Sequence, residues 1–179
     1  MNKLESALSQ IGSPLRLRKL IQELLATDIT THAALLTGTH GEINSILTAD
    51  QTVNNSTTLV NITGLVAALE ANKLYAILAA LCFATGAVPD IKWAWTVPTG
   101  ATFQVVNRII DLGADREQST SGTASSISAD GSQDIIMSMG WVKTGANAGN
   151  LQPQFAQATA DASDTKMLIG SWLFVKKLA

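Results

Sequence analysis

Apolar residues at helical spacing mark the beginning of the chain. Ser13-Pro14 is a favourable helix start, because serine accepts a bond from a free amide and proline fits the first turn. The apolar positions that follow it are Leu17, Leu20, Ile21, Leu24 and Leu25. Charged and polar residues fill the positions between them, so one face of the predicted helix is apolar. This face must bury against the main domain, a copy of the same chain or a partner.

Runs of β-forming residues, each closed by Gly, Pro, Asn, Asp or Ser, fill the chain from residue 46 onward. The predicted strands are 46–53, 57–63, 74–84, 91–97, 101–112, 124–128, 134–143, 151–158 and 166–178. Residues 64–72 are predicted to form a helical turn, and 119–132 a loop around one short strand. The pattern predicts two parts, a helical arm and linker at 1–45 and a head domain at 46–179. The fold class is therefore mainly β, and eight or nine strands fit an antiparallel sandwich or jelly roll.

Three predicted strands, 74–84, 134–143 and 166–178, are apolar on both faces. An antiparallel sandwich normally exposes one face of each sheet to water, so a strand with two apolar faces indicates that the second face meets another subunit. The alternative is that the N-terminal helix covers this face. We favour an oligomer, because 45 weakly structured residues are a thin cover. The candidate interface residues are Tyr75, Ile77, Phe83, Trp141, Trp172 and Phe174.

Composition and charge narrow the function classes. The 179 residues hold 12 Lys and Arg against 14 Asp and Glu, a formal net charge of −2, with 46% apolar and 15% charged residues. This composition excludes intrinsic disorder and argues against a general nucleic-acid binder, which needs excess positive charge. The N-terminus lacks the apolar core of a secretory signal, and the most apolar run, 74–84, is too short to span a membrane. We expect a protein made in a cytoplasm, with neither nucleic acid nor membrane as partner.

The sequence carries no motif for phosphate binding, zinc proteolysis, a nucleophile elbow or a disulfide pair. His32 and His40 lie in a turn-rich segment without the spacing of a metal site. Asp111, Asp115 and Glu117 form an acidic cluster, but Arg116 interrupts it, so we interpret it as a solvated loop. We therefore predict no cofactor and no metal.

The other reactive or ring-bearing side chains are interpreted as structural. Trp93 and Trp95 share one face of a predicted strand, which favours a core over a sugar-stacking platform. Cys82 lies inside the most apolar strand and is interpreted as a small core residue. Ser171 lacks the flanking glycines of a hydrolase serine. These observations do not support an enzyme.

Short motifs in residues 31–179 resemble a module of tailed-bacteriophage structural proteins. In the last 40 residues these motifs are Gly140-Trp141-Val142, Thr144-Gly145, Ala148-Gly149-Asn150-Leu151, Phe155-Ala156-Gln157 and Gly170-Ser171-Trp172-Leu173-Phe174-Val175. Upstream they are 69–75, Asp90-Ile91-Lys92 and Pro98-Thr99-Gly100, in the same order. Thr31-His32-Ala33-Ala34 and Gly38-Thr39-His40-Gly41 resemble a linker of phage fibre and decoration proteins.

This resemblance implies a jelly-roll head similar to the tumour-necrosis-factor and complement-type heads, which assemble as homotrimers. It also implies a place on a virion. The first interpretation is a trimeric capsid decoration (cement) protein whose arm binds the major capsid protein. The expected capsid contacts are Arg16, Leu17, Arg18, Lys19, Leu20, Ile21 and Leu24.

Two alternatives remain open. A tail or head fibre tip would bind a host surface receptor through loops such as 113–133. An enzyme of the cupin or glycan-hydrolase type would need a histidine cluster or a carboxylate pair inside the sandwich, and neither is visible.

Overall fold

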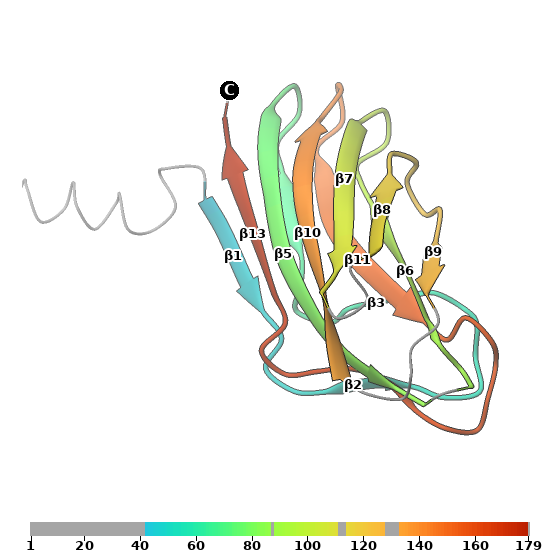
Figure 1. Cartoon of the computed structure of the whole chain (residues 1–179). Coiled ribbons are helices and arrows are strands. Elements are labelled where there is room, and N and C mark those ends of the chain that lie inside the picture. The colour runs from blue at the N-terminus through green and yellow to red at the C-terminus, as the bar shows by residue number, and fades with distance from the viewer. Residues whose placement is uncertain (1–41, 87, 111–113, 128–132, 179) are drawn as a thin grey trace, which may run out of the picture. The chain divides into compact units, whose positions relative to one another are not determined.

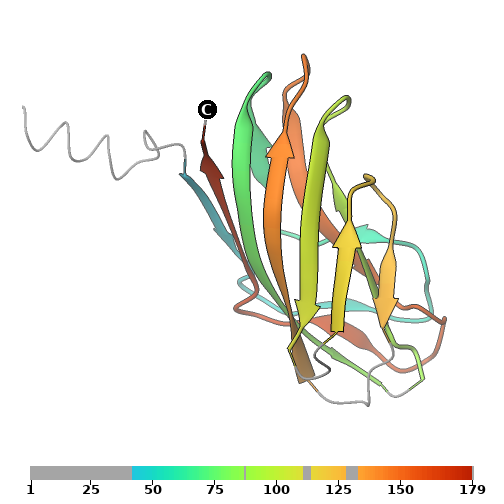
Figure 2. The same cartoon turned by 45° about the horizontal axis from the view of Figure 1, so that its top comes forward.

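The computed structural model describes residues 42–86, 88–110, 114–127 and 133–178. Within these ranges the chain forms thirteen strands and no helix, arranged as two antiparallel sheets packed into a sandwich (Figures 1 and 2). The mainly β fold class and the antiparallel sandwich are therefore confirmed. The predicted helical arm lies outside the described residues.

The larger sheet has eight strands, six of which lie in the order β1-β13-β5-β10-β7-β8. Its strands are β1 (Glu42–Ile46), β2 (Gln51–Val53), β5 (Leu74–Thr85), β7 (Thr102–Ile109), β8 (Ala114–Gln118), β10 (Gln133–Lys143), β12 (Thr165–Met167) and β13 (Trp172–Lys177). β12 pairs with β5 and β2 beyond the end of this path. Figure 1 shows β5 and β10 at the centre of the sheet, with β1 and β8 at its two edges.

The smaller sheet has five strands, in the order β3-β11-β6-β9 with β4 also paired to β11. Its strands are β3 (Val60–Asn61), β4 (Ala67–Leu69), β6 (Ile91–Thr96), β9 (Ser125–Ile127) and β11 (Gly149–Ala156). Figure 2 shows this sheet behind the larger one.

The core lies between the two sheets and follows from the two-residue period of the strands. In β7, every second side chain is buried and the others are exposed. The largest fully buried side chains include Trp93 and Trp95 from β6, Phe83 from β5 and Phe155 from β11. The prediction that Trp93 and Trp95 are core residues is confirmed, since both are 0% exposed.

Several predicted elements differ from the structure. The predicted strand 166–178 is divided into β12 and β13 at Gly170, whose φ of +87° takes the backbone out of the extended region. The segment 64–72 holds strand β4 in place of the predicted helical turn, since Leu65, Ala67 and Leu69 point into the core. Backbone 114–118, predicted as a solvated loop, pairs with β7 as strand β8.

Candidate functional site

Among the described residues, no group of three His, Cys, Asp or Glu side chains could hold a metal ion. The histidines His32 and His40 and the arm residues Arg16 to Leu24 lie outside this part of the chain. The hydroxyl of Ser171 is buried and hydrogen-bonded to backbone of Leu168 and Cys82, at 2.8 and 2.9 Å. Ser171 therefore links the turn at residues 168–171 to strand β5 through hydrogen bonds. No helix of the described residues is long and apolar enough to cross a membrane.

The thiol of Cys82 is half-buried and points away from the sandwich core. Burial raises the pKa of this thiol, and this outweighs a hydrogen bond with Ser171 that lowers it. The thiol therefore stays protonated at neutral pH and is a weak nucleophile. The prediction that Cys82 is a core residue is wrong in one respect, because the side chain belongs to the outer face of β5 and not to the interior.

The outer face of the larger sheet is built by alternation along β5. The side chains of Tyr75, Ile77 and Phe83 point inward and are 2%, 2% and 0% exposed. The alternate residues of β5, such as Leu78 and Ala80, point outward and are apolar as well. The period therefore gives this strand two apolar faces, of which the part of the chain that the structure describes covers only one.

Neighbouring strands extend this outer face into three rows of side chains. Residues that are directly paired across antiparallel strands lie on the same face of the sheet. The first row is Ile46, Trp172, Ala80, Met137 and Arg108. The second is Asn44, Phe174, Leu78, Met139, Val106 and Glu117. The third is Glu42, Lys176, Ala76, Trp141 and Gln104. The centre of each row is apolar, and polar or charged residues stand at the ends, except that the first row begins with the exposed Ile46.

The outer face has one hollowed region and one projecting region. On the β1 side lies an open hollow of about 610 Å³, whose apolar walls are Ile46, Leu78, Trp172 and Phe174. On the β10 and β7 side stands a ridge formed by Met139, Trp141 and Val106, which are 67%, 40% and 38% exposed. We refer to these two sets of residues as the hollow and the ridge. The Cα pairing of Leu78 with Met139 makes them direct neighbours on one face.

The structure divides the six predicted interface residues into two groups. Tyr75, Ile77 and Phe83 pack in the core of this chain's own sandwich, where the smaller sheet covers them. Trp141, Trp172 and Phe174 lie on the outer face, in the ridge and in the hollow. Only the second group is accessible to another subunit. The sequence showed two apolar faces for these strands, but not which of them the second sheet covers.

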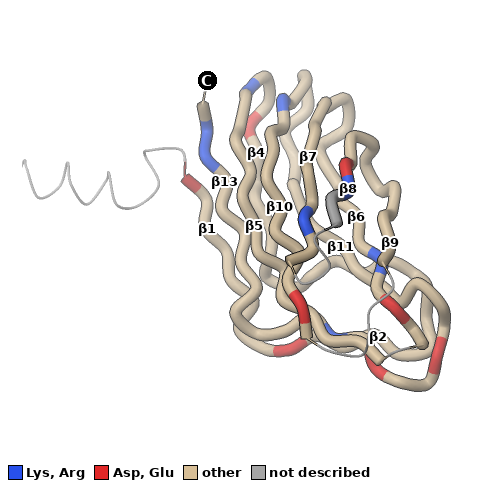
Figure 3. Tube along the Cα trace, viewed as in Figure 1, with Lys and Arg blue, Asp and Glu red and all other residues tan. Residues whose placement is uncertain are grey.

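Charged residues lie mainly around the outer face rather than on it. In Figure 3 the central parts of β13, β5 and β10 carry no charged residue, and the blue and red segments cluster toward the strand ends. At one corner Lys176 of β13 forms an ion pair with Glu42 of β1. An apolar centre within a polar and charged rim is the usual composition of a protein interface.

The outer face of the smaller sheet has the opposite character. Its outward positions alternate with the core residues of β6 and β11. They are Asn61, Ala68, Lys92, Ala94, Thr96, Ser126, Asn150, Gln152 and Gln154. The amide of Gln154 donates to Asn61 Oδ1 at 2.8 Å, so this surface partly satisfies its own polar groups. Among the described residues, the uncovered apolar sheet face therefore belongs to the larger sheet and not to the smaller one.

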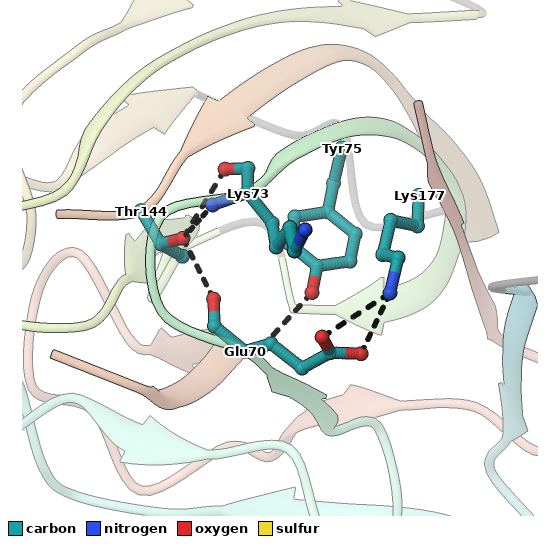
Figure 4. Close-up of polar contacts among 5 residues, drawn as sticks. All are labelled: Glu70, Lys73, Tyr75, Thr144 and Lys177. Atoms are coloured by element: carbon teal, nitrogen blue, oxygen red, sulfur yellow. Dashed lines mark hydrogen bonds and ion pairs between the residues drawn. The ribbon is translucent and has the colours of Figure 1, made fainter. Parts of the chain in front are cut away.

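A cluster of polar contacts links strand ends at one end of the sandwich (Figure 4). The hydroxyl of Thr144, 3% exposed, donates to the backbone oxygen of Glu70 at 2.7 Å and accepts from the backbone N–H of Lys73 at 2.8 Å. The Tyr75 hydroxyl accepts from the backbone N–H of Glu70 at 2.9 Å. The Lys177 ammonium lies 2.9 and 3.1 Å from the two Glu70 carboxylate oxygens. These contacts join the β4–β5 turn, the end of β10 and the end of β13.

The ion pair in this cluster makes stability depend on pH. The hydrogen bond and the charge of Lys177 lower the pKa of Glu70, and the same contact raises the pKa of Lys177. A lowered carboxyl pKa contributes stability that is present above the unfolded pKa of about 4.3 and is lost as the pH falls through the lower, folded pKa. A raised lysine pKa contributes stability that is lost as the pH rises through the folded value.

We expect Glu70→Gln to flatten the acid side of the stability curve. The free energy of unfolding in urea, measured in steps from pH 7 down to pH 3 at one protein concentration, should fall less steeply in the variant than in the wild type. Lys177→Gln should flatten the same part of the curve, and the double variant should add little to either change. Equal slopes in wild type and Glu70→Gln would show that the pair does not contribute to folding.

A second, buried network lies beneath the ridge. The side chain of Asn107, 0% exposed, accepts from Ser138 at 2.7 Å and from Trp95 Nε1 at 3.2 Å. Its amide donates to Gln118 Oε1 at 3.1 Å and to the backbone oxygen of Arg116 at 3.2 Å. The network links β6, β7, β8 and β10, so it holds the strands of the ridge in register against the smaller sheet.

Comparison with known proteins gives little further information. No protein-family model matches the chain, and no curated protein matches it. A chain from the structure of infectious bursal disease virus, Gt strain, aligns with 77% of this chain and 38% of its own length, at 12% identity and a TM-score of 0.23. A chain of the Gx strain gives 14% identity, 77% and 36% coverage and a TM-score of 0.23.

A chain of the VP2 subviral particle of infectious bursal disease virus aligns with 77% of this chain and 37% of its own length, at 9% identity and a TM-score of 0.21. This chain thus spans well under half the length of the viral chains that it resembles. The structural similarity to these viral proteins extends over much of the chain, but it is weak. At such TM-scores it carries no argument about function.

Proposed function

We propose that this protein is a virion structural protein, a trimeric capsid decoration protein that binds and stabilises a bacteriophage head. The observation that carries the proposal is the apolar outer face of the larger sheet. No other described residues cover this face, and it needs a protein partner to exclude water. The second support is the resemblance of residues 31–179 to phage structural modules. Many of its motifs lie in strands of the sandwich, including Gly140-Trp141-Val142 in β10 and 172–175 in β13.

The order of the strands supports a jelly-roll interpretation of the sandwich. In the larger sheet β1, β13, β5 and β10 are neighbours, and in the smaller sheet β3, β11, β6 and β9 are neighbours. Strands that are distant in sequence therefore lie side by side, while consecutive strands such as β5 and β6 belong to opposite sheets. This alternation between sheets is expected where a long hairpin is wrapped into a sandwich.

The mechanism is stabilisation by linkage. A trimer that binds the assembled capsid, and not its separated subunits, lowers the free energy of the assembled state. In this proposal the apolar outer faces join the three copies, and the arm residues Arg16, Leu17, Arg18, Lys19, Leu20, Ile21 and Leu24 contact the major capsid protein. Neither role requires a cofactor or a catalytic group.

The proposal is tested by the copy number of the protein in purified virus particles, measured by quantitative mass spectrometry against the major capsid protein. Hundreds of copies per particle are expected for a decoration protein. A few dozen copies or fewer would instead favour the fibre-tip alternative, and with it a receptor-binding role for the loops. Absence from the particle would overturn the virion function.

We expect Met139→Glu to convert the trimer into folded monomers. Met139 is exposed in the single chain, so a carboxylate at this position is hydrated in the monomer. In a trimer that buries the outer face, the same carboxylate loses its hydration without a partner, which costs several kcal/mol per site. Light scattering at micromolar concentration should give three chain masses for the wild type and one for the variant, with unchanged β-type circular dichroism.

The matched control is Ala68→Glu, which adds a carboxylate to an exposed position on the outer face of the smaller sheet. We expect this variant to keep the trimer mass. A monomeric wild type would remove the argument for an assembly face, and a trimeric Met139→Glu would move the interface away from the ridge.

A further inference from the structure

We propose that the ridge of each copy enters the hollow of a neighbouring copy, so that the subunits close into a ring. The inference rests on the proposed function, because it assumes that the chain assembles with itself through the larger sheet. It adds the contact itself: Met139, Trp141 and Val106 of one copy pack against Ile46, Leu78, Trp172 and Phe174 of the next.

Shape is the first reason. The hollow is open to solvent and has apolar walls, so water inside it makes few hydrogen bonds. The ridge holds one flexible side chain, Met139, and one large rigid one, Trp141, and both project from the same face. Methionine adapts to irregular cavities, and tryptophan is a frequent anchor of interfaces. A face that bears both a hollow and a projecting apolar group is complementary to a second copy of itself.

Charge favours a second copy as the occupant, while the size of the apolar face indicates only that some partner covers it. Five strands about 4.8 Å apart and seven residues along β5 give an apolar face of roughly 550 Å², near the upper limit for a typical monomer and below the ~800 Å² that each partner buries in a standard interface. The Glu42–Lys176 pair neutralises the charges nearest the hollow. A partner therefore needs an apolar surface there and no complementary charge, which the ridge provides.

The two halves of the face allow a closed ring. If each ridge enters the hollow of a different neighbour, the contact is heterologous, and a rotation that closes leaves neither half uncovered. A reciprocal dimer is the other possible arrangement, in which two copies exchange both contacts. Because the two arrangements connect different numbers of chains, cross-linking distinguishes them.

The test uses the full chain in a Cys82→Ala background, with Ile46→Cys in the hollow and Met139→Cys in the ridge. A short bismaleimide should give little product with either single variant. An equal mixture of the two single variants should give covalent dimers, and the double variant should give covalent trimers. Ser126→Cys, on an exposed position of β9, replaces Ile46→Cys in the control mixture and should give no dimers.

The outcomes separate this inference from the proposed function. Covalent trimers from the double variant support the ridge-in-hollow ring. If the double variant gives covalent dimers but no covalent trimers, the ring is overturned in favour of the reciprocal dimer. Trimer mass by light scattering without cross-links would overturn the contact but leave the trimeric function intact. A monomer mass would overturn both.

Discussion

Gly140→Ala is expected to prevent the sandwich from folding, or to lower its free energy of unfolding by about 3 kcal/mol or more. Gly140 lies in the middle of β10, paired with Ile77 of β5 and Val105 of β7. A Cβ atom at this position would overlap the backbone oxygen of Gln104 and lie 2.8 Å from the Cα atom of Val105. These are backbone atoms of the neighbouring strand, so they cannot move aside without breaking the β7–β10 pairing.

The control for this prediction is Gly149→Ala at the start of β11. Its nearest neighbours would be the Cβ and Cγ atoms of Pro98, at 3.3 and 3.4 Å, which belong to a buried side chain and not to the backbone of a neighbouring strand. We expect a loss of about 1 kcal/mol or less there. The urea midpoints of the two variants, followed by circular dichroism at one protein concentration, give the comparison. Similar midpoints for Gly140→Ala and wild type would show that β7 and β10 can separate at low cost.

The sequence predicted which segments form strands better than it predicted which face of each strand is buried. The two-residue period correctly placed β5, β6 and β10, and it identified Trp93 and Trp95 as core residues because polar residues occupy part of the opposite face. The period could not orient β5, since Tyr75 and Leu78 are both apolar. Burial of one of two apolar faces depends on the second sheet, which is brought there by residues far away in the sequence.

The sequence predicted that an apolar outer face exists, but it did not predict the shape of that face. Strands with two apolar faces indicate an interface, and Trp141, Trp172 and Phe174 are the three predicted interface residues that remain accessible. The hollow could not be predicted, because its walls come from β1, β5 and β13, and β1 begins at Glu42 rather than at 46. The shape of this surface depends on the register between paired strands that are about 130 and about 100 residues apart in sequence.

The buried network was missed, although the sequence held a signal for it. Asn107 occupies an inward position of β7, in phase with Val105 and Ile109, and Ser138 occupies an inward position of β10, in phase with Ile136. A polar side chain in the apolar phase of a strand must find a hydrogen-bond partner across the sheet. Two such residues in neighbouring strands predict a pair, which is the contact that the structure contains.

Asn107→Leu is therefore expected to lower the free energy of unfolding by about 3 to 5 kcal/mol, more than most single substitutions. Leucine has a similar volume, so it leaves little empty space. It removes the acceptor of Ser138 and of Trp95 Nε1 and the donor to Gln118, and each buried polar group left without a partner costs about 1–3 kcal/mol. Urea unfolding followed by tryptophan fluorescence, at matched protein concentration, measures the change.

Two further variants show whether the loss comes from the network. Gln154→Leu removes an exposed amide whose partner is Asn61 on the outer face of the smaller sheet, and it should change stability by about 0.5 kcal/mol or less. Ser138→Ala combined with Asn107→Leu should cost less than the sum of the single changes, because both variants break the same hydrogen bond. Additive losses would instead mean that Asn107 and Ser138 contribute independently. In that case packing, and not the network, would hold β7 and β10 together beneath the ridge.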